Sequence, residues 1–251
     1  MSSTPVGPLP AAVDRRTVTP FSMLYRVLLR EIVTPGRLGV IGALTLVAVL
    51  ASFAIGQSSP EGMVEAQRAA EFVEIFGLVV VVPIVALVFA TAVIGDLRED
   101  QTLVYLWLRP MPPASALAAA ATVVVPAVAI PLGASAVIAG GDTDVVVGTL
   151  VASAVGAVAY CAVFLAASVV LSRVLLWGLA YILIWEGFIA SSDGAARLAI
   201  RAYTSSILAD VSSYEVGLGI HSTTTALLVL VPVTIVSMAL TVWRYSGSTV
   251  D

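Results

Sequence analysis

Residues 145–171 read VVVGTLVASAVGAVAYCAVFLAASVVL, a run of 27 residues without a charged side chain. A helix of about 20 mostly apolar residues is long enough to cross the roughly 30 Å hydrocarbon core of a bilayer. A soluble protein built from buried helices would still carry polar faces on most of them, and this run has none. The stretch therefore predicts a transmembrane helix.

Composition extends that interpretation to the whole chain. Of its 251 residues, 59% are apolar and only 11% are charged, against about 25% charged in an average soluble domain. The sequence predicts an all-α fold, a polytopic membrane protein with six transmembrane helices in a domain of residues 37–251. The six runs are residues 38–56, 75–94, 114–139, 145–171, 174–190 and 224–243.

The arginines predict the orientation in the membrane. The chain has no lysine, so all twelve of its positive charges are arginines. With the N-terminus in the cytoplasm, nine arginines lie on the cytoplasmic side, and Arg68, Arg197 and Arg201 lie outside. Cytoplasmic loops carry the excess of positive charge in membrane proteins. We therefore expect a multi-pass protein of the cell (cytoplasmic or inner) membrane with both termini in the cytoplasm.

The N-terminal part divides into two predicted segments. Residues 1–18 are polar and rich in proline, so we expect a disordered cytoplasmic N-terminus and no signal peptide. Residues 19–36 have the spacing of an amphipathic helix, which we expect to lie in the membrane interface. Its anchors are Tyr25 on the apolar face and Arg26 and Arg30, four positions apart, on another face. The alternative is a solvated helix that leads into the first span.

Residues 95–113, GDLREDQTLVYLWLRPMPP, connect the second and third predicted spans. Charged residues flank a short predicted helix in which Leu103, Leu106 and Trp107 share one face. Prolines then end this helix at Pro110. A short connection needs neither an apolar stripe nor a tryptophan, so we expect the stripe to pack on the membrane surface or on a cytoplasmic partner protein.

In this loop the sequence resembles the permease subunits of ATP-binding-cassette (ABC) transporters, in the ABC type-2 family. The family's loop typically reads acidic, basic and acidic, then Thr-Leu, a few apolar residues and proline. Gln101 departs from the pattern, because glycine is common there, and so do Pro112-Pro113, where a basic residue often follows. The resemblance implies that the loop is a coupling helix in contact with an ATPase subunit. The residues it assigns to that contact are Arg98, Glu99, Asp100, Thr102, Leu103, Leu106, Trp107, Arg109 and Pro110.

The resemblance also implies partners and a function. It implies an exporter whose permease works as a dimer, either with a second copy or with a related chain, while ATP and Mg bind to a separate ABC ATP-binding subunit. A phosphate-binding loop needs a Gly-rich turn followed by lysine, so a chain without lysine must leave ATP hydrolysis to another polypeptide. We expect no enzyme activity and no cofactor in this chain, and membrane lipids but no nucleic acid as further partners. Cys161 and His221 are its only cysteine and histidine, which excludes metal sites built from several such ligands, and we expect no metal.

Glu186, in the sequence YILIWEGF of residues 181–188, is the only carboxylate well inside a predicted span. A charge in hydrocarbon is costly unless it is paired, protonated or hydrated, so such residues are functional candidates. We therefore assign Glu186, with Tyr160 and Tyr181, to a substrate path. The alternative is that Glu186, near the outer end of its span, marks the membrane boundary and reaches outer water.

Two further patterns bear on packing. Gly148, Ala152 and Gly156 recur every four residues, and small residues at this spacing let two helices approach closely in lipid. Residues 191–223 are long for a loop, and both a soluble loop and short helices fit them. In the resembling family, short helices at this position cap the exit of the path.

Three other functions compete with that of a transport subunit of this kind. A secondary transporter should show several intramembrane charges or an internal repeat. An intramembrane enzyme needs a catalytic constellation within the spans, and the sequence offers none. A non-transporting membrane scaffold or immunity protein fits the composition equally well.

Overall fold

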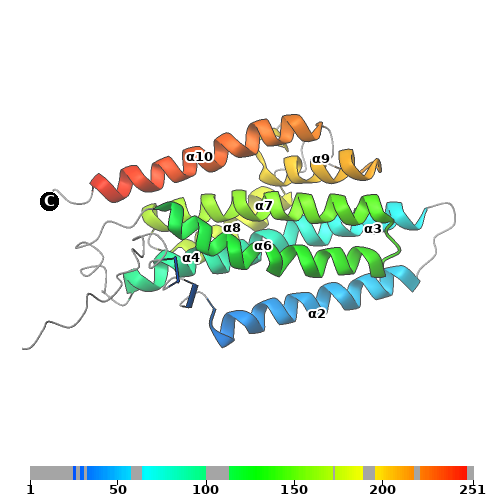
Figure 1. The fold of residues 1–251 in the computed structure, drawn as a ribbon, viewed down its shortest axis with the longest axis horizontal. Helices are drawn as coiled ribbons and strands as arrows, with labels where there is room; N and C mark the ends of the chain where they lie inside the picture. The colour runs from blue at the N-terminus through cyan, green and yellow to red at the C-terminus, as the bar shows by residue number, and fades with distance from the viewer. Residues whose placement is uncertain are drawn as a thin grey trace, which may run out of the picture.

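A computed structural model of the protein describes residues 25–26, 29–30, 33–57, 64–99, 113–171, 173–188, 196–217 and 221–247, with the backbone alone for 94–99, 113, 196 and 245–247. Within these ranges all regular structure is helical, and the helices form an elongated bundle (Figure 1). The elements are α2 (Pro35–Gln57), α3 (Glu65–Phe72), η1 (Val73–Val81), α4 (Val82–Glu99), α6 (Pro113–Ile138), α7 (Thr143–Val170), α8 (Val174–Ala180), η2 (Tyr181–Phe188), η4 (Ala196–Leu198), α9 (Ile200–Ser212) and α10 (Thr223–Gly247).

Five helices of the described chain are long and apolar enough to cross a membrane. They cover the first, second, third, fourth and sixth predicted spans. The prediction of a helical fold with several long apolar helices, as in a multi-pass membrane protein, is therefore confirmed. The prediction of the fifth span, over residues 174–190, is not confirmed. The apolar helix described there, Val174–Phe188, has fewer than 18 residues, and residues 189 and 190 lie outside the described part of the chain.

The second crossing begins earlier than the sequence predicts. Helix α3, the π-helical segment η1 and helix α4 follow one another without a break from Glu65. Arg68 in α3 is buried, and its Nη1 donates to the carbonyl oxygen of Ile55 at 3.1 Å. That carbonyl lies near the end of α2, where a cation also compensates the negative end of the helix dipole. Arg68 thus ties α2 to α3.

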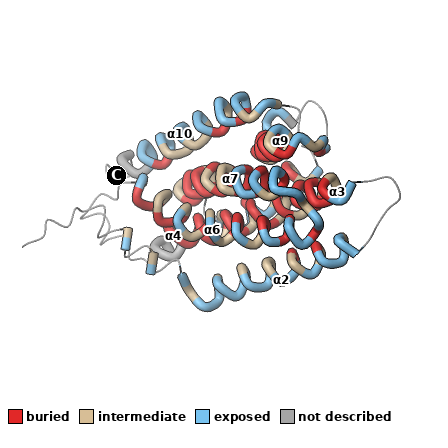
Figure 2. The backbone as a smooth tube through the Cα atoms, turned by 45° about the vertical axis from the view of Figure 1, so that its right-hand side comes forward, coloured by how far each residue is buried: buried red, intermediate tan, exposed pale blue. Residues whose placement is uncertain are grey.

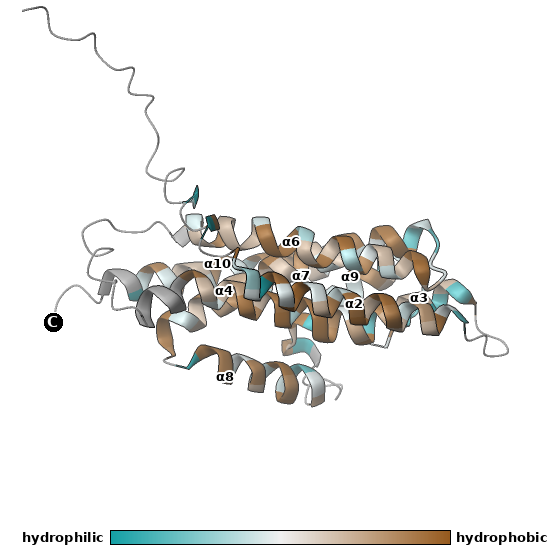
Figure 3. Cartoon of the chain, turned by 90° about the horizontal axis from the view of Figure 1, so that it is seen from below, coloured by the Kyte–Doolittle hydropathy of each residue, from teal (hydrophilic) through white to brown (hydrophobic). Residues whose placement is uncertain are grey.

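Helix α7 lies at the centre of the bundle and packs against α4, α6, α9 and α10. Figure 2 shows buried residues gathered along these inner helices, whereas α2 and α10 are mostly exposed. Leu46, Leu50 and Phe53 of α2 are each more than half exposed, and apolar residues cover the outer helices in Figure 3. Side chains of this kind on the outside fit a surrounding of lipid, which is as apolar as leucine.

The small residues of α7 make room for α9. A Cβ on Gly156 would lie 2.9 Å from the methyl carbon of Thr204, and one on Gly148 would lie 3.2 Å from the carbonyl oxygen of Leu208. Ala152, between them, is completely buried. The close approach predicted for this stripe is therefore confirmed, and its partner is a helix of the same chain.

The fifth passage through the bundle is made of two pieces. Helices α8 and η2 start next to the C-terminal end of α7, and η2 reaches the first turn of α9 through Glu186. From there α9 runs beside α7 toward its N-terminal end, where the hydroxyl of Tyr214 donates to Asp142 at 2.9 Å. In Figure 1 the start of α2 and the end of α10 lie at the same end of the bundle. Which side of the membrane that end faces stays a prediction.

Candidate functional site

The carboxylate of Glu186 lies inside the bundle and joins η2 to α9. Its side chain is completely buried. Its Oε1 accepts hydrogen bonds from the hydroxyl of Tyr181 at 2.8 Å and from the backbone N–H of Ile200 at 3.2 Å. Its Oε2 accepts the backbone N–H of Arg201 at 3.3 Å. Three donors from two separate elements therefore converge on one carboxylate.

Local backbone structure explains this convergence. Hydrogen bonds in a π-helix join residues five apart, which places Tyr181 and Glu186 on the same side of η2. The first N–H groups of an α-helix have no partner within the helix, and Ala199, at the N-cap of α9, has no side chain that could accept them. Glu186 accepts two of them from another element, and its negative charge suits the positive end of the helix dipole.

Two further polar groups lie beside Glu186. Tyr160 is completely buried, and its hydroxyl faces the carboxylate without a hydrogen bond of ordinary geometry. The Nε of Arg201 is also buried and makes no hydrogen bond to the described residues. Buried polar atoms nearly always have a partner in proteins. The cluster thus contains donors that the described protein atoms do not use.

The structure brings together the three residues predicted to line a substrate path. Tyr160 lies ten residues before the end of α7 at Val170, or about 15 Å at the rise of an α-helix. Glu186 lies beside it in the interior of the bundle, and its predicted position near the outer end of a span stays a prediction. The alternative, that Glu186 reaches outer water, is contradicted by its complete burial.

Glu74 is a buried carboxylate that the sequence analysis did not single out. It lies in η1, is 6% exposed, and its Oε2 accepts the backbone N–H of Gly217 at 2.8 Å. The predicted second span started at residue 75, one position too late to include it. The signal was present in the sequence, because Ala66, Ala69, Ala70 and Val73 repeat at helical spacing and extend the helix upstream.

Helix α9 itself carries hydroxyl groups into the bundle. Thr204, Ser205 and Ser206 are at most 1% exposed. The hydroxyls of Thr204 and Ser206 donate to backbone carbonyls of their own helix at 2.9 and 2.7 Å, whereas the Oγ of Ser205 has no described partner. The segment predicted as either an outer loop or short helices is therefore helical over Ile200–Ser212 and largely buried.

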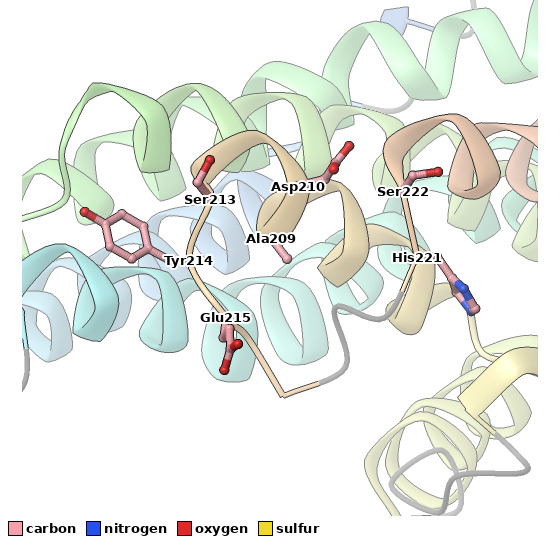
Figure 4. Close-up of a pocket in the computed structure, with 7 residues that line it drawn as sticks. All are labelled: Ala209, Asp210, Ser213, Tyr214, Glu215, His221 and Ser222. Carbon is pink, nitrogen blue, oxygen red and sulfur yellow. The ribbon is translucent and has the colours of Figure 1, made fainter.

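A pocket of about 450 Å³ lies between the end of α9 and the start of α10 (Figure 4). Asp210 caps α10 there, because its Oδ2 accepts the N–H of Thr223 at 2.9 Å. Among the described residues, no group of three or more histidine, cysteine, aspartate or glutamate side chains could hold a metal ion. The pocket is lined by Ala209, Asp210, Ser213, Tyr214, Glu215, His221 and Ser222.

The residues predicted to contact an ATPase subunit fall at the edge of the described chain or outside it. Arg98 and Glu99 end α4, and only their backbone is described. The coupling helix therefore stays a prediction. Its other residues, Asp100, Thr102, Leu103, Leu106, Trp107, Arg109 and Pro110, lie outside the described residues.

The predicted interfacial anchors are described in part. Tyr25, Arg26 and Arg30 are helical, with both arginines exposed and Tyr25 half-buried. The hydroxyl of Tyr25 donates to the Oγ1 of Thr122 in α6 at 3.0 Å. Tyr25 therefore contacts a membrane span, and the contact of the two arginines with lipid phosphates stays a prediction.

Chemically, the interior cluster can hold a charge, donate hydrogen bonds and orient a helix. Glu186 supplies the charge, the two tyrosines and Arg201 supply donors, and α9 is the helix that is oriented. No family model matches this chain, and no curated protein or solved structure is similar to it.

Proposed function

We propose that this chain is the transmembrane permease subunit of an ATP-driven ABC exporter. It forms the substrate path and couples it to ATP hydrolysis by a separate nucleotide-binding subunit. The observation that carries the proposal is the sequence of residues 98–110, in which charged residues, Thr-Leu, an apolar stripe and a proline follow in that order. The absence of lysine assigns ATP and Mg to the partner.

The position of this loop supports the proposal. Helix α4 ends at Glu99 and α6 begins at Pro113, so the loop connects two long membrane helices. The end of α4 and the start of α6 lie at the end of the bundle at which α2 begins and α10 ends (Figure 1). A subunit bound at that end of the membrane would meet the loop, whose prolines restrict the backbone and so suit an element that transmits motion.

The polar interior supports a path through the bundle. Most buried residues in a membrane bundle are apolar or small, and ionisable ones default to functional roles. Glu186, Tyr160 and Tyr181 form a polar cluster at the junction of two helical pieces. We assign this cluster, with the hydroxyls of α9, to the substrate path.

Orientation and assembly complete the proposal. We place the protein in the cell membrane with both termini in the cytoplasm, on the strength of the arginine distribution. The permease pairs with a second copy or with a related permease chain. Arg26 and Arg30, both exposed, face lipid phosphates from the N-terminal helix.

One observation favours a second candidate, a secondary transporter. Such transporters bind their substrates at broken membrane helices, whose N-terminal ends point at anionic groups near the middle of the bilayer. The start of α9 at Glu186 has this arrangement, and Glu74 and Arg68 are further buried charges. A secondary transporter would need no ATPase partner, and this difference separates the two functions.

The test is a pair of double variants in the native membrane. Leu106→Ala with Trp107→Ala should release the ATPase subunit or uncouple its ATP hydrolysis from transport, because each buried apolar side chain stabilises an interface by about 1.5–3 kcal/mol. Together they should weaken association about a hundredfold or more. The matched control is Leu175→Ala with Trp177→Ala, since these residues of α8 are 57% and 59% exposed.

The control variant should retain the ATPase subunit and its activity. Both variants should insert into the membrane at the parent level, which a protease or labelling assay verifies. If the Leu106 and Trp107 variant keeps its ATPase subunit and transports like the parent, residues 98–110 are not the coupling element and the proposal fails.

A further inference from the structure

Helix α9 is held at both ends by buried carboxylates from different elements. At its start, Glu186 of η2 accepts the N–H groups of Ile200 and Arg201. Five residues beyond its end, Glu74 of η1 accepts the N–H of Gly217. Both carboxylates lie in π-helical segments, which are rare and are frequently found at functional sites in proteins.

The surface of α9 differs from that of a lipid-facing helix. Its buried face combines Ile207 and Leu208 with Thr204, Ser205 and Ser206. Moving such hydroxyls into hydrocarbon is costly unless they are hydrogen-bonded, whereas moving them into water is not. Thr204 and Ser206 bond to carbonyls of their own helix, so the Oγ of Ser205, without a described partner, is the hydroxyl for which contact with lipid tails would be costly.

The junction at Glu186 also contains buried hydroxyls without a hydrogen bond of ordinary geometry. They are the hydroxyl of Tyr160, beside the Glu186 carboxylate, and the Oγ of Ser205. Tyr160 faces the carboxylate, and Ser205 lies one turn along α9 from Arg201. Water at the junction would provide hydrogen-bond partners for these groups. Its entry would break few of the existing hydrogen bonds of the bundle.

From these contacts we propose that Glu186 and Glu74 are the two positioning residues of a latch that ties the α9 segment to η2 and η1 and so keeps α9 packed on α7. When the latch opens, the hydroxyl face of α9 becomes the wall of a water-filled path. The cause of the opening rests on the proposed transport function. The latch contacts do not, because they lie within this chain. Two acceptor oxygens are essential at Glu186, because both accept donors and a glutamine would direct its NH₂ group at one of those donors.

The test measures access of water to α9 in the full-length protein, in lipid vesicles and without ATP or a partner. Cys161→Ala removes the native thiol, and Ser205→Cys adds a reporter on α9 at a side chain that is completely buried. A second reporter, Ser135→Cys in α6, is matched to it, because Ser135 is also completely buried and its Oγ also lacks a described partner. A membrane-impermeant maleimide labels whichever reporter becomes accessible.

Glu186→Gln and Glu74→Gln should each raise the labelling rate of Ser205→Cys at least about fivefold, with the Ser135→Cys rate unchanged. The control Glu65→Gln, at an exposed carboxylate of α3, should change neither rate. Equal rises at both reporters would mean general loosening of the bundle and would overturn the latch. An unchanged Ser205→Cys rate in both variants would overturn it as well.

A measurement on the unsubstituted protein keeps the proposal testable if Glu186→Gln does not fold. First-turn amides of a helix have no partner within the helix and exchange quickly unless another group holds them. Hydrogen exchange at Ile200 and Arg201 should therefore be as slow as at amides in the middle of α7. Exchange at the rate of an unstructured peptide would overturn the latch. Neither result depends on an ATPase subunit, so a failed latch and a failed transport function are distinguishable.

Discussion

The backbone N–H of Arg201 donates to the Oε2 of Glu186 over 3.3 Å, although the two residues are fifteen positions apart in the chain. This bond joins the end of one short helix to the start of another in the interior of the bundle. An uninterrupted membrane helix would satisfy its own backbone and would need no such carboxylate. The break in the fifth passage and the buried charge are therefore two aspects of one local structure.

Two tyrosines beside Glu186 provide a matched pair of substitutions. Tyr181→Phe removes a hydroxyl that donates to the carboxylate and should lower the free energy of unfolding by about 1–2 kcal/mol. Tyr160→Phe removes a buried hydroxyl without a described hydrogen bond and should leave stability within about 0.5 kcal/mol of the parent. Thermal unfolding in detergent micelles measures both. A larger loss for Tyr160→Phe than for Tyr181→Phe would contradict the hydrogen-bond pattern.

The packing of α9 on α7 predicts a steric effect at Gly156. An added methyl group would lie 2.9 Å from the side chain of Thr204, so Gly156→Ala should displace α9 and cost about 1–3 kcal/mol of stability. Gly39→Ala in α2 is the control, because nothing lies within 4 Å of its Cβ position and alanine favours helix. The comparison is the difference in melting temperature. Equal melting temperatures of the two variants would mean that α9 does not lie against Gly156.

Asp142 links the start of α7 to Tyr214, and this link predicts a pH effect. Its Oδ1 caps α7 at the N–H of Val145, and its Oδ2 accepts the Tyr214 hydroxyl. That hydrogen bond, followed by burial and the charges of Asp142 and Asp144, raises the pKa of Tyr214 above its ordinary value. Stability from this bond is present below the ordinary tyrosine pKa of about 10 and is lost as pH rises through the raised pKa.

Asp142→Asn should therefore lower the pKa of Tyr214 toward its ordinary value. Tyrosinate absorbance during an alkaline titration measures it, with Tyr214→Phe identifying the signal. Asp142→Ala should in addition remove the cap of α7 and cost about 1 kcal/mol. If Tyr214 titrates alike in the parent and in Asp142→Asn, the two side chains are not bonded in solution.

The predicted orientation has a direct labelling test. In a Cys161→Ala background, Gln101→Cys and Asp144→Cys should react with an impermeant thiol reagent from opposite sides of the membrane. Asp144 serves the outer side well, because it is exposed and takes no part in the cap at Asp142. Labelling in inverted vesicles measures access from the opposite side of the membrane. Reaction of both from the same side would contradict the direction of the crossings.

Residues whose burial follows from local periodicity were predictable from the sequence. Apolar runs such as residues 145–171 locate the long helices, because hydrocarbon accepts only helices with satisfied backbones and apolar surfaces. The stripe of Gly148 and Gly156 predicted a close helix partner, although the sequence did not name α9. Grouping Glu186 with Tyr160 and Tyr181 also agrees with the cluster in the structure.

The remaining features depend on contacts between distant segments. Hydropathy over residues 174–190 looks like that of a full span, and nothing local signals the π-helical segment η2 over Tyr181–Phe188. The role of Glu186 depends on Ile200 and Arg201, which belong to another helix. Glu74 was missed because hydropathy placed the start of the second span at residue 75, whereas the helix is amphipathic from Glu65 onward.

The most direct measurement is isolation of the tagged parent chain from its native membranes in mild detergent, followed by identification and counting of its partners. We predict a nucleotide-binding protein with a Gly-rich loop and lysine, in a one-to-one ratio to this chain, and ATP hydrolysis in the isolated material. The Leu106→Ala and Trp107→Ala variant, isolated in parallel, should lose that protein. An intact, folded chain that carries no nucleotide-binding protein and no ATP hydrolysis would contradict an ATP-driven permease and would favour a secondary transporter.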